Sequence, residues 1–489
     1  MKKFIAYFLV VSTLSFAAVA YCNYLYDGTG VLNRDLSGVR MTPNQAFCKV
    51  RYVLENPDRY DSFCFGSSRV TALNLNRIND GGKWYNMTYA AGSPQMWLHD
   101  LRLLLDQGVH VSTVLVGIDD LSCNEEPIEK KQADAYKHPY ERWDFSYYMG
   151  LLLHKPSALP SPLLAQEKGS IFDLYGTGRT YSPWIDEQAE KNPEKYKKEP
   201  RFLLPYIYPD NGQYEAQLEA LRKLKQLADE NNIKIVFFMN PVAAATYLNE
   251  DKAVLKRWKR DIAAITDFYD FTGMNEINTD NLSFLETSHY REITGDRMID
   301  RMMNGAPEAA PGFGFLVTAE NLDEHETMLA MQERSWLETH PLETEWFNVG
   351  RGLASLPSDF EIGRAEEGMA FNLDVIDGHE FMGRQAEHRL SQELVVGGWF
   401  LTAGKTPEKV LLCLTGKDGK KRYTLLRQDF NQDLIGKLSS SDDPAHAWFF
   451  AHVDVSSLPA GLYDLSFVAE AKDGKYWRTG QAALLNMVL

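Results

Sequence analysis

Short apolar runs and one-sided helical patterns alternate along residues 61–303. Five runs have the length and composition of short strands: Asp61–Gly66, Tyr85–Tyr89, Thr113–Gly117, Ile233–Met239 and Phe268–Phe271. We expect helices from about Val70, from Pro94 to Gly108, over the segment that stops at Asn231, over about 250–265, and from near Thr294. This alternation predicts a parallel sheet with helices on both faces, an α/β three-layer sandwich. Ligands of such folds bind beyond the carboxyl ends of the strands.

Residues 121–212 interrupt this pattern. A loop of that length without structure is implausible, so we expect helices in it and interpret it as a cap over the site. Its aromatic residues Trp143, Tyr175 and Trp184 are candidates for stacking on a sugar, although packing in the core of the cap is the role that we favour for them.

The C-terminal part of the chain has a different character. Ala319–Glu338 is helical by composition, and we assign 319–364 to a helical linker. From residue 365 to 489, short alternating runs are separated by turn signals such as Asp418-Gly419 and Asp473-Gly474, which predicts an all-β sandwich. Exposed tryptophans there, Trp399 or Trp477, would suit carbohydrate binding, but the domain could equally only brace its neighbour.

The first 26 residues form a separate segment. Lys2 and Lys3 precede an uncharged run, and residues 4–22 as a helix would span roughly 28 Å, close to the thickness of a bilayer core. The lysines place the N-terminus inside and the body outside. We expect a membrane anchor, and the alternative is a signal peptide cleaved after Ala18-Val19-Ala20. Both interpretations make the body extracytoplasmic.

Composition narrows the class of partner. The formal net charge of −16 opposes binding to a phosphate backbone, so we expect no nucleic-acid partner. Five cysteines without metal-ligand spacing indicate neither a disulfide framework nor a zinc site, although a bridge between Cys48 and Cys123 stays open. The acidic run from Asp323 to Glu326 is interpreted as a solvated helix face. We expect no metal and no cofactor.

Two loops carry the residue types of a serine nucleophile and its base. Gly66-Ser67-Ser68-Arg69 follows the first strand, where a serine at a helix N-terminus has its N–H aimed outward, ready to hold an oxyanion. Helix capping is the alternative role of these serines. Glu286-Thr287-Ser288-His289 precedes the last helix, and a carboxylate three residues ahead of a histidine can reach its Nδ1 and fix the tautomer.

Glycines and aspartates follow the next two strands. Gly92 lies after the second strand, and Gly117-Ile118-Asp119-Asp120 follows the third. Loops after neighbouring strands can bring backbone N–H groups around one point, although plain turn formation explains them as well.

In their order and placement, these four blocks resemble those of the SGNH (GDSL-like) hydrolase superfamily. The family's Gly-Asp-Ser-Leu block matches Gly66–Arg69, its second-block glycine matches Gly92, its Gly-x-Asn-Asp block matches 117–120, and its Asp-x-x-His block matches 286–289. The resemblance covers roughly 60–305 and implies a flavodoxin-like catalytic domain over 27–318. It is nearest to exported alginate O-acetyltransferase-like proteins and to the anchored protein of the teichoic-acid D-alanylation pathway.

The resemblance implies roles for these residues. Ser68 would be the nucleophile, with Ser67 as runner-up, His289 the base and Glu286 the third member. Ser68, Gly92 and the position of Asp119 would form the oxyanion hole, with Gly66, Ser67 and Arg69 in support. Two departures stand out: Glu286 replaces aspartate, and Asp119 replaces asparagine. Because an ionised carboxylate cannot donate to an oxyanion, we predict that Asp119 instead pairs with Arg69.

The function implied is that of a serine esterase or O-acyltransferase on acyl esters of a cell-envelope polysaccharide, with a membrane-bound acyltransferase as a candidate partner. The departures at 119 and 286 motivate an alternative from another class: a catalytically silent partner that binds polymer or an acyl carrier within a membrane assembly. A third interpretation is carbohydrate binding through the 365–489 domain alone.

Overall fold

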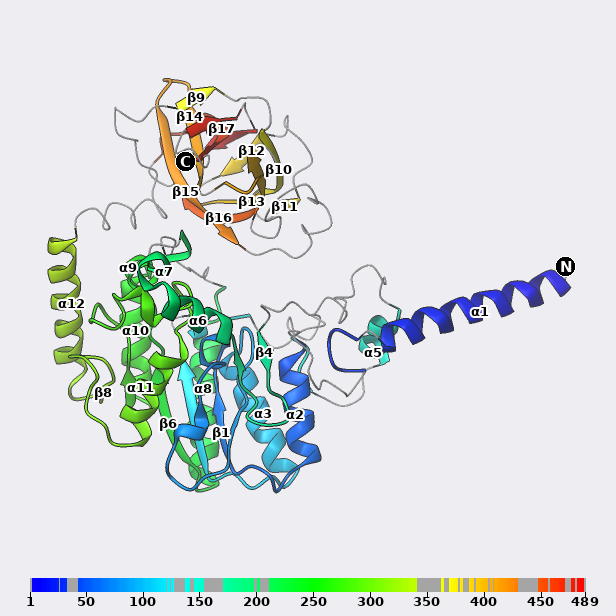
Figure 1. Ribbon diagram of the computed structural model, residues 1–489, viewed down its shortest axis with the longest axis vertical. Coiled ribbons are helices and arrows are strands. Elements are labelled where there is room, and N and C mark those ends of the chain that lie inside the picture. The colour runs from blue at the N-terminus through cyan, green and yellow to red at the C-terminus, as the bar shows by residue number, and fades with distance from the viewer. Residues whose placement is uncertain are drawn as a thin grey trace. The chain divides into compact units, whose positions relative to one another are not determined.

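The computed structural model divides into two compact units (Figure 1). The first comprises residues 1–198 and 206–336, and the second comprises 199–205 and 337–489. The residues it describes are 2–25, 27–32, 43–119, 121–123, 125–126, 137–140, 145–153, 170–197, 200–202, 211–340, 362–364, 369–376, 379–380, 387–390, 393–402, 405–407, 409–429, 447–455, 458–470, 476–479 and 482–487.

A six-stranded, mostly parallel sheet forms the centre of the first unit. Its strands are β1 (Ser62–Phe65), β2 (Trp84–Asn86), β3 (Thr113–Ile118), β6 (Lys234–Met239), β7 (Phe268–Asp270) and β8 (Phe315–Val317). They lie in the order β2-β1-β3-β6-β7-β8, and only β8 is antiparallel to its neighbour. The five parallel strands have the 2-1-3-4-5 order of doubly wound folds, in which the chain reverses direction across the sheet between β1 and β3. The predicted α/β class with a parallel sheet is confirmed.

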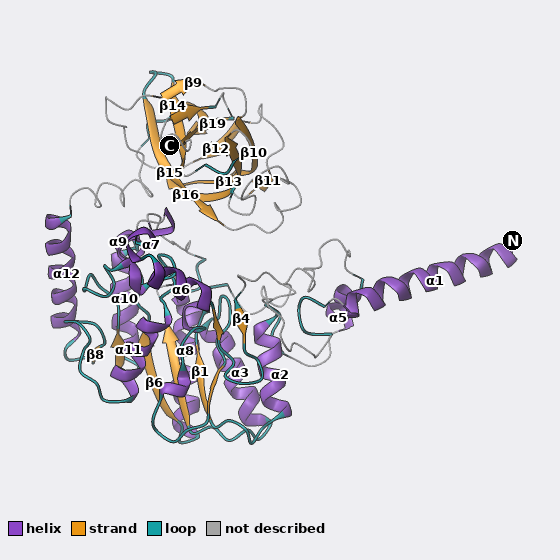
Figure 2. Cartoon of the chain, in the orientation of Figure 1, coloured by secondary structure: helices purple, strands orange, loops and turns teal. Residues whose placement is uncertain are grey.

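Helices connect and follow these strands (Figure 2): α2 (Gln45–Glu55), α3 (Pro94–Asp106), α8 (Tyr214–Glu230), α9 (Ala244–Asn249), α10 (Lys252–Ala263), α11 (Glu292–Met303) and α12 (Leu322–Thr339). Proline at the first turn of α3 needs no N–H donor there, and Asp251 caps α10 by accepting from Ala253 N–H and Val254 N–H. The helices predicted from Pro94, before Asn231, over 250–265 and near Thr294 are confirmed.

The helix predicted from Val70 is wrong. The chain makes only two 3₁₀ turns there, Ser68–Val70 and Leu75–Arg77. The Val70 carbonyl accepts from the side-chain amide of Asn86 at 3.1 Å, and the Thr71 carbonyl accepts from Thr180 N–H at 2.9 Å. These tertiary donors take the place of the i+4 amides that an α-helix would supply.

The interruption after β3 contains structure of its own. The described elements are α5 (Phe145–Leu152), the hairpin β4 (Ile171–Phe172) and β5 (Thr180–Tyr181), α6 (Pro183–Lys191), α7 (Pro193–Tyr196) and two 3₁₀ turns, Leu121–Cys123 and Pro200–Phe202. Near the N-terminus, α1 (Lys2–Leu25) is long and apolar enough to cross a membrane, as a helical anchor or a signal sequence would be.

Buried charges tie α12 to the sheet. His325 Nε2 lies 2.8 Å from a carboxylate oxygen of Asp270, and Lys259 Nζ lies 2.8 Å from the same oxygen. All three side chains are buried. Although burial opposes the ionised form, Lys259 and His325 hold the pKa of Asp270 below its usual value. The interpretation of 323–326 as a solvated face is therefore wrong at His325.

A buried lysine on α2 gives the first unit a pH-dependent stability. Burial lowers the pKa of Lys49 to about 7, and its ammonium donates to the Thr88 carbonyl. Because an unfolded lysine titrates near 10.4, the unfolded state binds more protons between pH 7 and 10, so stability rises with pH over that window.

We expect Lys49→Met to raise the free energy of unfolding, because the variant has no lysine to deprotonate on folding. The increase should be larger at pH 7 than at pH 10, by on the order of 3 kcal/mol. Urea midpoints of both proteins across this range measure the difference, and a gain independent of pH would contradict the assignment.

The second unit is built from strands. They are β9 (Ile362–Arg364), β10 (Met369–Ile376), β11 (His379–Glu380), β12 (Glu387–Leu390), β13 (Glu393–Thr402), β14 (Lys409–Gly416), β15 (Lys421–Asp429), β16 (Trp448–Asp454), β17 (Gly461–Glu470), β18 (Tyr476–Arg478) and β19 (Ala483–Met487). Gly419, with a φ of 75°, turns the predicted hairpin between β14 and β15. The ring of Phe467 packs against Phe400 and Phe449, at 6.2 and 5.1 Å between centroids. The strands thus surround a main core, with smaller apolar clusters beside it, as a β-sandwich-like body.

The tryptophans and the second hairpin expected in this unit have different outcomes. Trp399 is half-buried and packs with Trp448 against Leu401 and Ala447, which leaves less of its face for a sugar. The side chain of Trp477 and the turn at Asp473-Gly474 lie outside the described residues.

Candidate active site

Ser68 stands directly beyond the carboxyl end of β1, at the point where the sheet order reverses. The 3₁₀ turn Ser68–Val70 follows the strand, and Ser67 caps this turn by accepting from Arg69 N–H at 3.2 Å. Ser67 is buried, whereas Ser68 is only partly so. The two adjacent serines therefore divide the roles considered for them: Ser67 caps the turn, and Ser68 has an accessible hydroxyl.

His289 is held on a narrow loop before α11. Leu285 N–H donates to the His289 carbonyl at 2.7 Å, and a β-bridge joins Phe284 to Tyr290, so the loop between them is closed at its base. Within it, a carboxylate oxygen of Glu286 accepts from Ser288 N–H at 2.9 Å. This bond fixes the carboxylate in the position from which it meets the imidazole.

These two loops meet although 221 residues separate the serine from the histidine. His289 Nε2 lies 2.8 Å from Ser68 Oγ, and the other ring nitrogen, Nδ1, is hydrogen-bonded to a carboxylate oxygen of Glu286. The histidine side chain is 27% exposed and that of the glutamate 29%. A hydroxyl, an imidazole and a carboxylate in this order can move the hydroxyl proton to Nε2 while the carboxylate stabilises the imidazolium.

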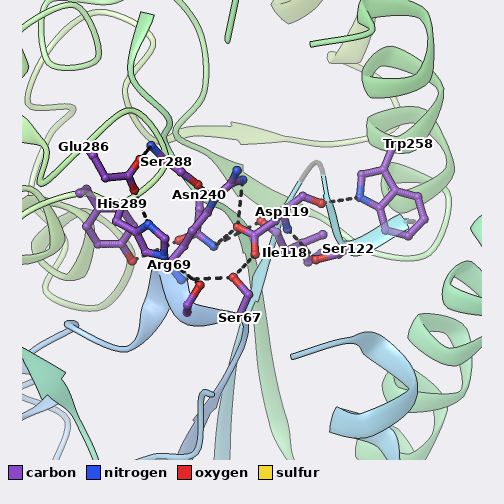
Figure 3. A network of polar contacts seen from close by, with 12 residues as sticks. Ser67, Arg69, Ile118, Asp119, Ser122, Asn240, Trp258, Glu286, Ser288 and His289 are labelled. Carbon is purple, nitrogen blue, oxygen red and sulfur yellow. Dashed lines mark hydrogen bonds and ion pairs between the residues drawn. The ribbon is translucent and has the colours of Figure 1, made fainter. Parts of the chain in front are cut away.

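Asp119, at the end of β3, is fully buried among polar partners (Figure 3). Arg69 Nη1 lies 3.5 Å from one carboxylate oxygen, and Asn240 Nδ2 donates to the same oxygen at 2.8 Å. The other oxygen accepts from the Ser67 hydroxyl. The predicted ion pair between Arg69 and Asp119 is present.

The same network reaches the histidine loop. Arg69 Nε donates to Ser288 Oγ at 3.0 Å, and Ser288 is the residue before His289. Tyr290, the residue after it, donates its hydroxyl to Asn240 at 3.1 Å. Burial raises the pKa of Tyr290, which keeps this hydroxyl protonated. The turn that carries Ser68 and the loop that carries His289 are therefore joined through one set of buried polar side chains.

Three glycines allow the strand ends to approach one another. A Cβ added at Gly92 would lie 2.3 Å from the Gly66 carbonyl oxygen, and one at Gly117 would lie 2.5 Å from a methyl group of Val70. A Cβ at Gly66 would lie 2.6 Å from the same methyl group. Gly66 is needed for this close approach and not for a left-handed turn, since its φ is not positive.

The residues expected in an oxyanion hole differ in what they can donate. Gly92 N–H donates to the Tyr89 carbonyl at 3.1 Å, so its use by an oxyanion would require that bond to be given up. The carboxylate of Asp119 accepts from its neighbours and has nothing to donate. The N–H of Ser68 has no protein acceptor in the described part of the chain. Of the three expected groups, it is therefore the donor that is available to an oxyanion.

A cavity of about 210 Å³ opens beside Ser68 and His289. It is lined by Gln45, Ser68, Arg69, Thr71, Ala72, Ala90, Ser170, Thr180, Tyr181, Ser182, Leu285, His289 and Tyr290. Ser170, Thr180, Tyr181 and Ser182 belong to the segment interpreted as a cap, so the described part of that segment forms one wall of the cavity. The volume suits a small acyl group better than a long chain.

Of the three aromatic residues proposed for sugar stacking, the two that the structure describes, Tyr175 and Trp184, are not among the cavity-lining residues. Tyr175 packs edge-on against Tyr52, at 5.5 Å between ring centroids, which fits the alternative of a cap core. Trp184 lies on α6 and is partly buried. Trp143 lies outside the described residues.

Asn240, Ser288 and Gln45 were missed in the sequence. Asn240 follows β6 directly, as Asp119 follows β3, and a polar residue at the end of a strand was the available signal. Gln45 opens a helix that carries no motif. No disulfide joins Cys48 to Cys123. Within the described ranges, no group of three His, Cys, Asp or Glu residues is arranged to hold a metal ion.

No protein-family model and no curated protein match the chain. Among solved structures, the chain shows similarity to CopC from Methylosinus trichosporium OB3b at 12% identity, over 24% of this chain and 97% of that chain, with a TM-score of 0.16. A similarity at that TM-score carries no argument about function.

Proposed function

We propose that the chain is a serine-dependent ester hydrolase or O-acyltransferase of the SGNH type, with Ser68 as nucleophile, His289 as general base and Glu286 as its orienting carboxylate. The observation that carries the proposal is the 2.8 Å contact between Ser68 Oγ and His289 Nε2, with Glu286 on the opposite ring nitrogen. This contact lies beside a small cavity, at the point where the strand order of the sheet reverses, and this position also supports the proposal.

The reaction would proceed in two acyl transfers. His289 Nε2 takes the proton of Ser68 as Oγ attacks the ester carbonyl carbon, and the resulting oxyanion is held by Ser68 N–H. The imidazolium then returns the proton to the leaving alcohol, and the acyl group stays on Ser68. Water or a sugar hydroxyl repeats the sequence in the opposite direction, which releases a carboxylic acid or a new ester.

The substrate class rests on the resemblance and on the N-terminal segment. We propose acyl esters of a cell-envelope polysaccharide outside the cytoplasm, with α1 as the anchor. A membrane-bound acyltransferase would supply the acyl group if the reaction is transfer. The anchor is supported by the length and apolar character of α1.

A fluorophosphonate probe tests the proposal, since only a serine activated by a base reacts with it. We expect labelling of the full chain in detergent, with the adduct on the peptide that contains Ser68, and loss of the adduct in His289→Ala. The alternative, a silent partner that binds polymer or an acyl carrier, is favoured by the carboxylate of Asp119 beside the nucleophile turn. That alternative predicts no adduct in the folded wild-type protein.

A further inference from the structure

The short helix α5 is made of apolar and aromatic residues, yet none of them is buried. Its sequence is Phe-Ser-Tyr-Tyr-Met-Gly-Leu-Leu. Phe145 at its start is 59% exposed, and Leu153, directly after its end, is 46% exposed. Large apolar side chains therefore face the solvent at both ends of this helix.

The neighbour of α5 is the C-terminal end of α1, the helix that is long and apolar enough to cross a membrane (Figure 1). Asn23 Nδ2 donates to the Leu152 carbonyl at 2.7 Å and ties the two helices together. Tyr21 and Tyr24 are exposed at this end of α1. Tyrosines at the end of a membrane-spanning helix are enriched at the level of the lipid headgroups, which would be the level of α5 with α1 as an anchor.

On its other side, α5 is attached to the body that carries the active site. The ring of Tyr147 stacks on His138 with 3.8 Å between centroids. Asn44 Nδ2 donates to the His138 carbonyl at 2.8 Å, and the side-chain oxygen of Asn44 caps α2 by accepting from Phe47 N–H. Gln45, the next residue, lines the cavity beside Ser68. A chain of contacts thus leads from α5 through His138 and Asn44 to a residue that lines the cavity.

We propose that α5 lies in the headgroup region of a phospholipid bilayer, beside the end of α1, with Phe145 and Leu153 inserted among the lipids. A surface helix of this kind gains free energy from the apolar area that it buries at the boundary between headgroups and acyl chains. The lipid is favoured over a protein partner because α5 adjoins a helix that would itself emerge from the bilayer at this level. The cavity would then open close to the membrane surface.

The proposal does not depend on catalysis, and its test has no activity readout. The full chain with Cys22→Ser, whose other four cysteines are buried, is given one new thiol by Phe145→Cys or, separately, Leu153→Cys. An environment-sensitive fluorophore is attached, and the protein is reconstituted into vesicles of phosphatidylethanolamine and phosphatidylglycerol. Met331→Cys is the matched control, because Met331 is an apolar residue on α12 of the same unit that is 66% exposed.

We expect fluorophores at 145 and 153 to emit at shorter wavelength than at 331, to be quenched by lipids with a spin label near the headgroup, and to resist aqueous iodide severalfold better than the control. Iodide quenching at 145 and 153 equal to that at 331 would overturn the proposal. Protection from iodide without quenching by the spin-labelled lipid would also overturn it, since a second copy of the chain or another protein would then cover α5. Two labelling sites guard against one variant that fails to fold.

Discussion

Replacing Ser68 by alanine is expected to lower kcat/KM for a chromogenic acetate ester by about 10⁴-fold or more. The reason is that Ser68 Oγ is the atom in contact with His289 Nε2, at 2.8 Å, and no bond to the acyl carbon can form without it. Its hydroxyl is partly exposed and caps nothing, so the free energy of unfolding should change little. Steady-state rates with the full chain in detergent, together with urea midpoints, measure both quantities.

Ser170 provides the control for this substitution. It lines the same cavity, but its hydroxyl is bonded to Ser182 Oγ at 2.8 Å instead of to a histidine. Ser170→Ala should therefore retain most of the activity. A Ser68→Ala protein that turns over ester at the wild-type rate would refute the assignment of the nucleophile.

Removing the guanidinium of Arg69 is expected to destabilise the first unit by about 3–5 kcal/mol, because a buried carboxylate is left without its counter-charge. Arg69 and Asp119 are both essentially inaccessible to solvent. Arg69→Leu removes this cation and keeps the neutral donors Ser67 and Asn240 on the Asp119 carboxylate. Asp119→Asn should be costly in the same way, since Arg69 then keeps its charge in the interior.

The double variant Arg69→Leu with Asp119→Asn distinguishes a coupled pair from two independent residues. It restores a neutral combination at these positions, so its cost should be well below the sum of the single costs. Unfolding in urea, monitored through hydrogen exchange of the β3 amides, reports on the first unit alone. Additive costs would contradict the coupling. Arg77, whose ion pair with Asp300 is largely exposed, is the control, and Arg77→Leu should have little effect.

Local patterns in the sequence predicted most of the first unit. Apolar runs gave β1, β3, β6 and β7 nearly to the residue, and one-sided apolar spacing gave α3, α8, α10 and α11. These elements are predictable because burial of one face depends on spacing within a few residues. The edge strand β8 and the helix α2 were not predicted, although the apolar residues of α2 are as one-sided as those of α3.

The candidate site was predicted as a set of residue types, and the contacts within it depend on the fold. Gly66-Ser67-Ser68-Arg69 and the Glu-x-x-His spacing are local, so their positions beside a strand and before a helix could be inferred. Which serine faces the histidine is decided by Asp119, a residue from another strand that binds Ser67. The engaged N–H of Gly92 and the contribution of Asn240 likewise follow from contacts between strand ends.

The sequence alone determined where most strands and helices of the first unit form, that the first helix is long enough for a bilayer, and which residues could perform acyl chemistry. Only the tertiary structure decided that Ser68 meets His289 and that the Val70 segment is not a helix. The physical reason is the range of the interactions. Periodicity records the environment of each residue, whereas a hydrogen bond between residues 68 and 289, or from Asn86 to Val70, exists only once the sheet has brought distant segments together.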